Sequence, residues 1–283
     1  MTLLYEKLNN RLQKIADDGD AIFGFAVKDL VTGEEIHVNG NEIFPAASTI
    51  KVSILLEFFR RVEEMSLNPG ELIVFRSKDK AAGSGVLKML SEGSVTMPLI
   101  DYSTLMMTVS DNSATNMLID VLTMDKINMN LEQIGLKITR LARKMMDMDA
   151  ARSGHEFLTT PVEMIQLIDS MYRHDKLTPF ACEQTLRVMQ LPKEGLIQGV
   201  IRNSIPDQVP VANKSGWLSG ATCDIGLVYQ PSRPYAVVVF AKHIPVSDKH
   251  MFQTISELTK ATGFIQGYFE EVSSSTSFGR RVF

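Results

Sequence analysis

The chain has 283 residues, of which 45% are hydrophobic and 22% charged, so it can bury a sizeable core and is too apolar for a disordered or collagen-like protein. Its 29 Lys and Arg against 33 Asp and Glu give a net charge of −4 without long runs of one sign, which argues against a nucleic-acid or anionic-membrane partner. The longest apolar runs, residues 52–56 and 236–241, are far shorter than the roughly 20 residues that cross a bilayer, so no membrane span is expected.

The N-terminal segment combines helical hydrophobic spacing with interspersed charges. Leu4, Leu8, Leu12 and Ile15 recur every three or four residues, whereas an export signal needs an unbroken apolar core. We predict an amphipathic helix and a cytoplasmic protein as the sequence stands, or an exported one if a signal peptide has been removed before Met1. Two β-prone runs follow at 22–28 and 35–38, and the turn cluster between them predicts a hairpin.

The middle of the chain changes to helical periodicity, and strand character returns near the end. Helices are predicted over 50–65, 99–109, 114–122, 124–134, 161–171 and 179–189, strands over 221–229 and 235–244, and a last helix over 247–271. Strands at both chain ends predict an α/β subdomain made of residues 1–45 and 205–272, with an inserted all-helical subdomain at 46–204. Residues 273–283 are expected to be a disordered tail, and the cleft between the two parts is the expected site.

Several common chemistries lack their signatures in this chain. The two cysteines, Cys182 and Cys223, match neither a CxxC nor a metal-ligand spacing, so two buried thiols are expected. The five histidines include no HExxH pair, and there is no GxSxG elbow, phosphate loop or dinucleotide fingerprint. We therefore expect neither a metal nor a cofactor.

A serine and a lysine lie three residues apart where a loop enters the first predicted helix of the middle block. In Phe-Pro-Ala-Ala-Ser-Thr-Ile-Lys at 44–51, the spacing puts Ser48 and Lys51 on one helix face. The positive helix end suits a nucleophile whose substrate develops an oxyanion, and it lowers the pKa of Lys51 toward that of a usable base. SxxK alone is a weak signal, since a second copy beginning at Ser77 lies in a charged loop and is assigned no chemistry.

Two further motifs follow along the chain. Ser110-Asp111-Asn112 separates two predicted helices, where short polar side chains cap the second helix. Lys214-Ser215-Gly216 comes just before a predicted strand, where glycine would let a substrate backbone approach closely. Each triplet alone has an ordinary structural explanation, so the information lies in the ordered combination with SxxK.

This ordered set resembles that of class A β-lactamases and penicillin-binding serine hydrolases, and the resemblance covers nearly the whole chain, including residues 83–87 and 159–161. It implies a two-part α/β (α+β) fold, in which an antiparallel sheet is flanked by terminal helices and carries an inserted all-helical subdomain. It also implies acyl transfer through an acyl-serine intermediate.

The resemblance implies a role for each motif residue. Ser48 would be the nucleophile, Lys51 its base or proton relay, and Ser110 the donor to the leaving nitrogen. Substrate binding would use Asn112 for the amide side chain, Lys214 and Ser215 for the carboxylate, Gly216 for close approach, and the backbone N–H groups of Ser48 and Trp217 for the oxyanion.

Two positions depart from the family pattern. In the stretch 139–149, Met145 stands where the family has the glutamate that activates the deacylating water, and a thioether cannot take a proton. Asp147, Asp149 and Glu156 lie close in sequence, and whether one of them substitutes stays open. Thr222 stands where many relatives place an arginine that helps to hold the substrate carboxylate.

These observations predict a monomeric hydrolase of cyclic amides that takes a small β-lactam or peptidoglycan-like substrate and belongs to the antibiotic response or β-lactam catabolism. The expected activity is that of a β-lactamase with impaired deacylation. The alternatives are an esterase or D,D-peptidase-like enzyme, and a penicillin-binding protein without turnover.

Overall fold

The computed structural model describes residues 3–276 and 278–281, which form two compact units. Unit 1 comprises Met1–Thr49, Thr159–Asp169 and Gln198–Phe283, and unit 2 comprises Ile50–Leu158 and Ser170–Ile197. In the described part of the chain, no helix has the length and apolar character needed to cross a membrane.

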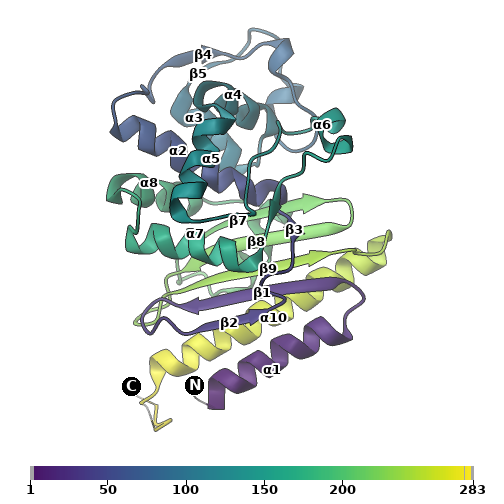
Figure 1. The fold of residues 1–283 in the computed structure, drawn as a ribbon, viewed down its shortest axis with the longest axis vertical. Helices are drawn as coiled ribbons and strands as arrows, with labels where there is room; N and C mark the ends of the chain where they lie inside the picture. Colours follow the sequence, from purple (N-terminus) through teal and green to yellow (C-terminus); the bar gives the residue numbers. More distant parts are fainter. Residues whose placement is uncertain (1–2, 277, 282–283) are drawn as a thin grey trace. The chain divides into compact units, whose positions relative to one another are not determined.

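A five-stranded antiparallel sheet forms the centre of unit 1 (Figure 1). Its strand order is β2–β1–β9–β8–β7, with bounds β1 (Ile22–Asp29), β2 (Glu35–Val38), β7 (Val211–Leu218), β8 (Ala221–Val228) and β9 (Tyr235–Lys242). The predicted hairpin is confirmed, because β1 and β2 pair antiparallel with Phe25 opposite Val38. β1 also pairs with β9, so both ends of the chain build one sheet, as predicted.

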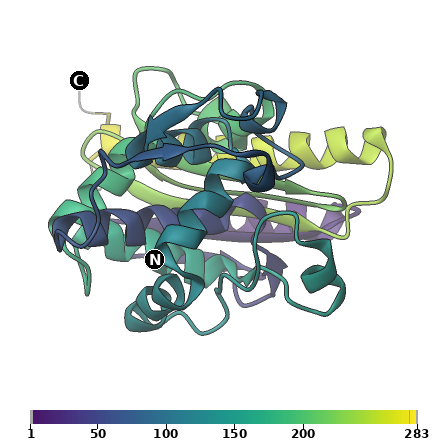
Figure 2. The same ribbon diagram turned by 90° about the horizontal axis from the view of Figure 1, so that it is seen from above.

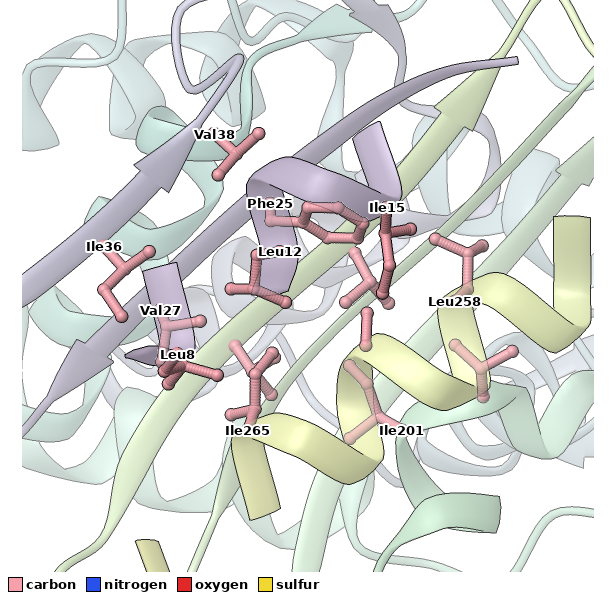
Figure 3. Packing of buried hydrophobic residues seen from close by; sticks show 14 of the residues in the cluster. Leu8, Leu12, Ile15, Phe25, Val27, Ile36, Val38, Ile201, Leu258 and Ile265 are labelled. Atoms are coloured by element: carbon pink, nitrogen blue, oxygen red, sulfur yellow. The ribbon is translucent and has the colours of Figure 1, made fainter. Parts of the chain in front are cut away.

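Helices from the two chain ends, α1 (Leu3–Asp18) and α10 (Asp248–Ser274), pack against each other and cover one face of this sheet (Figure 1). Leu8, Leu12 and Ile15 of α1 point into a core that includes Phe25 and Ile265 (Figure 3). Each buried Leu or Ile contributes about 1.5–3 kcal/mol, so the apolar stripe of α1 is what holds this helix to the sheet. The amphipathic helix is therefore confirmed.

The C-terminal helix is longer than its sequence periodicity predicted. α10 continues through Ser274, because the hydroxyls of Ser273 and Ser274 donate to the carbonyl oxygen of Glu270 at 3.1 and 2.7 Å and so stabilise its last turn. Ser275 and Arg281 then form an isolated antiparallel bridge. This part of 273–283 is thus structured where a disordered tail was predicted, whereas residues 277 and 282–283 lie outside the described residues.

Unit 2 is organised around one buried helix, α2 (Lys51–Glu63). It packs against α3 (Leu99–Thr108), α4 (Asn112–Leu122), α5 (Met124–Ile134) and α8 (Pro179–Met189) (Figures 1 and 2). Residues 51–59 of α2 are all buried, which is the pattern of a central helix rather than a surface one. The one acidic residue in this stretch, Glu57, receives two hydrogen bonds from Arg60, at 2.7 and 2.8 Å, and a third from Asn130 of α5.

Several short elements were not predicted from the sequence. They are β3 (Phe44–Pro45), β4 (Leu72–Val74), β5 (Thr96–Pro98), α6 (Met148–Arg152), β6 (Leu158–Thr159) and α9 (Gly199–Ser204), beside the predicted α7 (Pro161–Arg173). β4 and β5 pair antiparallel inside unit 2. The prediction that the middle of the chain is all-helical is therefore wrong. Three-residue strands are too short to show the alternation on which strand prediction depends.

Candidate active site

A tight turn in unit 1 positions Ser48. The short 3₁₀ helix η1 (Ala47–Ile50) runs directly into α2 along the chain, and both the amide and the hydroxyl of Thr49 bond the carbonyl oxygen of Ala46, at 3.0 and 2.6 Å. Ala47 has a φ of +46°, a left-handed conformation that costs energy in a residue with a Cβ. The hydrogen bonds of the neighbouring residues therefore stabilise Ala47 in this conformation. Ser48 is the next residue, and it is partly exposed.

Gly216 brings β7 against this turn. A Cβ added at Gly216 would lie 2.6 Å from the backbone nitrogen of Ser48 and 2.8 Å from the Cβ of Ala47. The Ser48 amide thus lies against β7 one residue from Trp217, so the two expected oxyanion-binding residues are neighbours within unit 1. From the opposite strand, the thiol of Cys223, paired with Gly216, donates to the carbonyl oxygen of Pro45 at 3.0 Å.

The Lys214-Ser215-Gly216 motif lies within β7, and not before a strand as predicted. Three polar residues, Asn213, Lys214 and Ser215, follow one another in this strand, yet β7 is buried along residues 211–216 and pairs with β8 along its whole length. Lys214 is fully buried, and its Nζ donates to the carbonyl oxygen of Ser215 at 2.6 Å. Thr222, in place of the arginine of many relatives, is buried opposite Trp217.

In unit 2, Lys51 is the first residue of α2 and is fully buried. Its Nζ donates to the carbonyl oxygen of Ser110 at 2.8 Å, the Oγ of Ser110 at 3.1 Å and the Oδ1 of Asn112 at 2.9 Å. These acceptors match the three N–H donors of an ammonium group. The structure therefore brings together the three unit 2 residues that the motifs singled out.

The turn that carries Ser110 and Asn112 is anchored by the residue between them. Asp111 caps α4, as predicted for this triplet, with Oδ1 accepting from the amide of Ala114 at 3.0 Å. Its Oδ2 accepts from the amides of Val86 and Leu87 at 2.6 and 2.9 Å, which docks the loop 83–87 onto the turn. A buried carboxylate with three N–H partners is a rigid support, and it fixes the residue on either side.

Asn116, which lies outside the three sequence motifs, holds the loop at Met145. Its Oδ1 accepts from the amide of Met145 at 2.7 Å, and its Nδ2 donates to the carbonyl oxygen of Met145 at 3.1 Å. Asn116 lies one helical turn after Asn112 on α4, so the two side chains share a helix face. This spacing is the feature of the sequence from which a role of Asn116 near the site could have been predicted. The Met145 side chain itself is buried.

The three carboxylates near Met145 each have a structural partner in unit 2. Asp147 caps α6 by accepting from the amide of Ala150 at 3.0 Å, and Asp149 pairs with Arg152. Glu156 pairs with Arg143 at 3.1 Å, and that guanidinium also lies 4.4 Å from the centre of the Phe157 ring.

The two cysteines, the second SxxK copy and the possibility of a metal site remain to be considered. Cys182 and Cys223 are buried free thiols, as predicted, and burial raises the pKa of Cys182 to about 12 and that of Cys223 further. Ser77 begins a short exposed 3₁₀ turn over Ser77–Asp79. The described residues contain no group of three or more His, Cys, Asp and Glu side chains suited to a metal ion.

Comparison with known proteins connects this geometry to a family. The model described as the beta-lactamase enzyme family matches residues 7–265. The chain belongs to this family. It is 22% identical over 258 residues to "Beta-lactamase SME-1" of Serratia marcescens, with 88% of this chain and 86% of that protein covered.

Two solved structures show the same fold. A β-lactamase from Sphaerobacter thermophilus is 25% identical with a TM-score of 0.80, over 93% of this chain and 97% of that chain. "PBP-A" is also 25% identical, with a TM-score of 0.82 over 93% of this chain and 96% of that chain. The fold class predicted from the motifs is thereby confirmed.

Proposed function

We propose that this member of the beta-lactamase family is acylated at Ser48 by β-lactams and releases the acyl group slowly. The observation that carries the proposal is the buried amine of Lys51, whose position is fixed by its hydrogen bonds to Ser110 and Asn112. Lys51 is the first residue of α2, and this helix follows directly after the turn that carries Ser48. A buried amine within hydrogen-bond reach of a serine hydroxyl has the geometry that proton transfer to or from that hydroxyl requires, and this supports the proposal.

Acylation, the first half-reaction, needs a nucleophile, a base, oxyanion donors and a proton donor, and the chain has a candidate residue for each. Neutral Lys51 takes the proton of Ser48 as its Oγ attacks the lactam carbonyl, and the three acceptors around Nζ stabilise the ammonium that results. The N–H groups of Ser48 and Trp217 bind the oxyanion. When the carbonyl–nitrogen bond breaks, Ser110 gives its proton to the nitrogen and regains one from Lys51, 3.1 Å away, so protons balance.

The buried amine of Lys214 in β7, together with Ser215, supports recognition of the substrate's carboxylate. With Thr222 in place of an arginine, Lys214 is the basic residue that the pair of strands β7 and β8 contributes to binding. The proposed substrate is therefore an anionic cyclic amide.

Deacylation needs a water activated by a base, and Met145 offers none. Asp147, Asp149 and Glu156 are engaged in a cap and two ion pairs, which supports slow release of the acyl group. Since general base catalysis contributes about 10²- to 10⁴-fold, the acyl-enzyme should persist for minutes or longer. The same observation favours a second function, a penicillin-binding protein without turnover, whose acyl-enzyme would outlast the assay.

Intact-mass spectrometry over time tests this proposal. Benzylpenicillin should add its full mass within seconds to minutes, and the adduct should then decay slowly. Ser48→Ala should give no adduct, while Ser77→Ala in the second SxxK copy is the matched control and should behave as the parent protein. An adduct that persists in Ser48→Ala would refute the assignment, and rapid turnover without a detectable adduct would refute slow release.

A further inference from the structure

A cavity in unit 2 is lined by none of the residues of the candidate active site. Its volume is about 390 Å³, within the range of roughly 300–1,000 Å³ that small-molecule sites occupy. Residues of β4, the start of α3 and α4 form its walls, and α3 packs against both α4 and β5 (Figure 1). The α4 residues of the cavity, Met117, Asp120 and Val121, belong to the second half of that helix, whereas Asn112 begins it. The cavity is therefore a candidate for a second ligand site.

Most of the residues that line this cavity have aliphatic side chains or a thioether. They are Leu72, Ile73, Val74, Leu99, Met117 and Val121. Leu99 and Met117 are buried, whereas Leu72 is 66% exposed and Val74 is 42% exposed, so a ligand in the cavity would remove apolar surface from water. In the described part of the chain, none of the lining residues is aromatic, so the cavity has no ring for a planar ligand to stack on. This lining suits a flexible alkyl chain.

Two basic and two acidic residues complete the lining, and their bonding differs. The Oδ2 of Asp79 accepts from the amide of Arg76 at 3.0 Å, and Asp120 forms an ion pair with Lys144 at 2.5 Å. Among the residues that the structure describes, neither the guanidinium of Arg76 nor the amine of Lys78 has a carboxylate partner, and both side chains are exposed. The two cations of the cavity are therefore available to an anionic head group.

We infer that this cavity binds a free alkyl carboxylate of medium chain length, whose chain lies against the aliphatic residues and whose head group binds Arg76 and Lys78. A guanidinium matches the geometry of a carboxylate with two parallel hydrogen bonds, and an alkyl chain adapts to an open aliphatic lining. The protein has a net charge of −4, so its overall field favours cations, and a preference for an anion must come from these two side chains. The inference does not depend on acylation of Ser48, because no group of the candidate active site takes part.

The experiment compares two ligands that have the same chain length and opposite charge. Decanoate and decylammonium are titrated into the full chain, and binding is measured by isothermal titration calorimetry. Decanoate should bind saturably, with one equivalent per chain, and more tightly than decylammonium by about 10-fold or more, because the cationic head group loses the charge-assisted contacts. Equal affinity for the two ligands, or no saturable binding of decanoate, would overturn the inference.

Paired variants locate the bound decanoate. Arg76→Gln and Lys78→Gln should each weaken its binding by about 3- to 10-fold, whereas Lys126→Gln, which removes the same charge from an exposed residue of α5 outside the cavity, should not change it. Leu72→Glu should weaken binding by about 10-fold or more, because it places a carboxylate against the alkyl chain at a position exposed enough for the fold to accept it. Leu196→Glu is its control, since Leu196 is 63% exposed in unit 2 and does not line the cavity. Undiminished binding of decanoate by Leu72→Glu would mean that the ligand binds elsewhere and would refute the site.

Discussion

Gly216→Ala tests whether the contact between β7 and the Ser48 turn is as tight as the structure shows. The added Cβ would lie 2.6 Å from the Ser48 nitrogen, whereas ordinary contacts begin at 3.4 Å, so the turn must move by about 0.8 Å. The obstacle is backbone and the Cβ of Ala47, neither of which can swing aside as a long side chain would. A misplacement of about 1 Å at a reacting group can cost roughly 100-fold in rate, and loss of one oxyanion donor costs about as much.

We therefore expect Gly216→Ala to lower the acylation rate constant for benzylpenicillin by about 100-fold, measured by intact mass under single-turnover conditions. Overpacking should also cost about 1–3 kcal/mol, seen as a lower Tm. Gly263→Ala in α10 is the control, because its added Cβ meets nothing within 4 Å, and this variant should acylate normally. Parent-like acylation by Gly216→Ala would refute the argument, since the turn would then tolerate a side chain at this position.

Three other variants test separate parts of the site and the fold. Lys51→Arg should slow acylation by at least about 100-fold, because a guanidinium does not release a proton to become a base, and an active variant would remove Lys51 from that role. Met145→Glu should shorten the adduct lifetime by about 10-fold or more, since Asn116 holds residue 145 in place, and an unchanged lifetime would contradict the missing-base explanation. Hydrogen bonds from His37 and Lys28 lower the pKa of Glu35 from 4.5 to about 2, so its ionised form stabilises the fold above pH 4.5 and this contribution is lost as the pH falls toward 2. Glu35→Gln should cost about 1 kcal/mol at pH 6 and less at pH 3, and an equal loss of Tm at both pH values would count against the pairing.

Much of the fold follows from local patterns. The hairpin at 22–28 and 35–38 was predictable because a turn cluster separates two β-prone runs, and both its strands are found. The helices of unit 2 were predictable from apolar spacing, and the capping role of Ser110-Asp111-Asn112 from its position between two of them. Three short motifs in a fixed order were sufficient to suggest the family, because the chemistry of acyl transfer demands particular side chains at particular spacings.

The tertiary structure decided which polar groups satisfy one another. β7 became a strand, despite its polar residues, because β8 pairs with it along its length. The bonds between Asn116 and Met145 join residues 29 positions apart, and the ion pair of Arg143 with Glu156 joins residues 13 apart. Such partners leave no periodic signal, because a buried polar group bonds whichever neighbour the packed chain brings within reach. For that reason the sequence showed that Met145 cannot act as a base, but only the folded chain showed that the nearby carboxylates are already engaged.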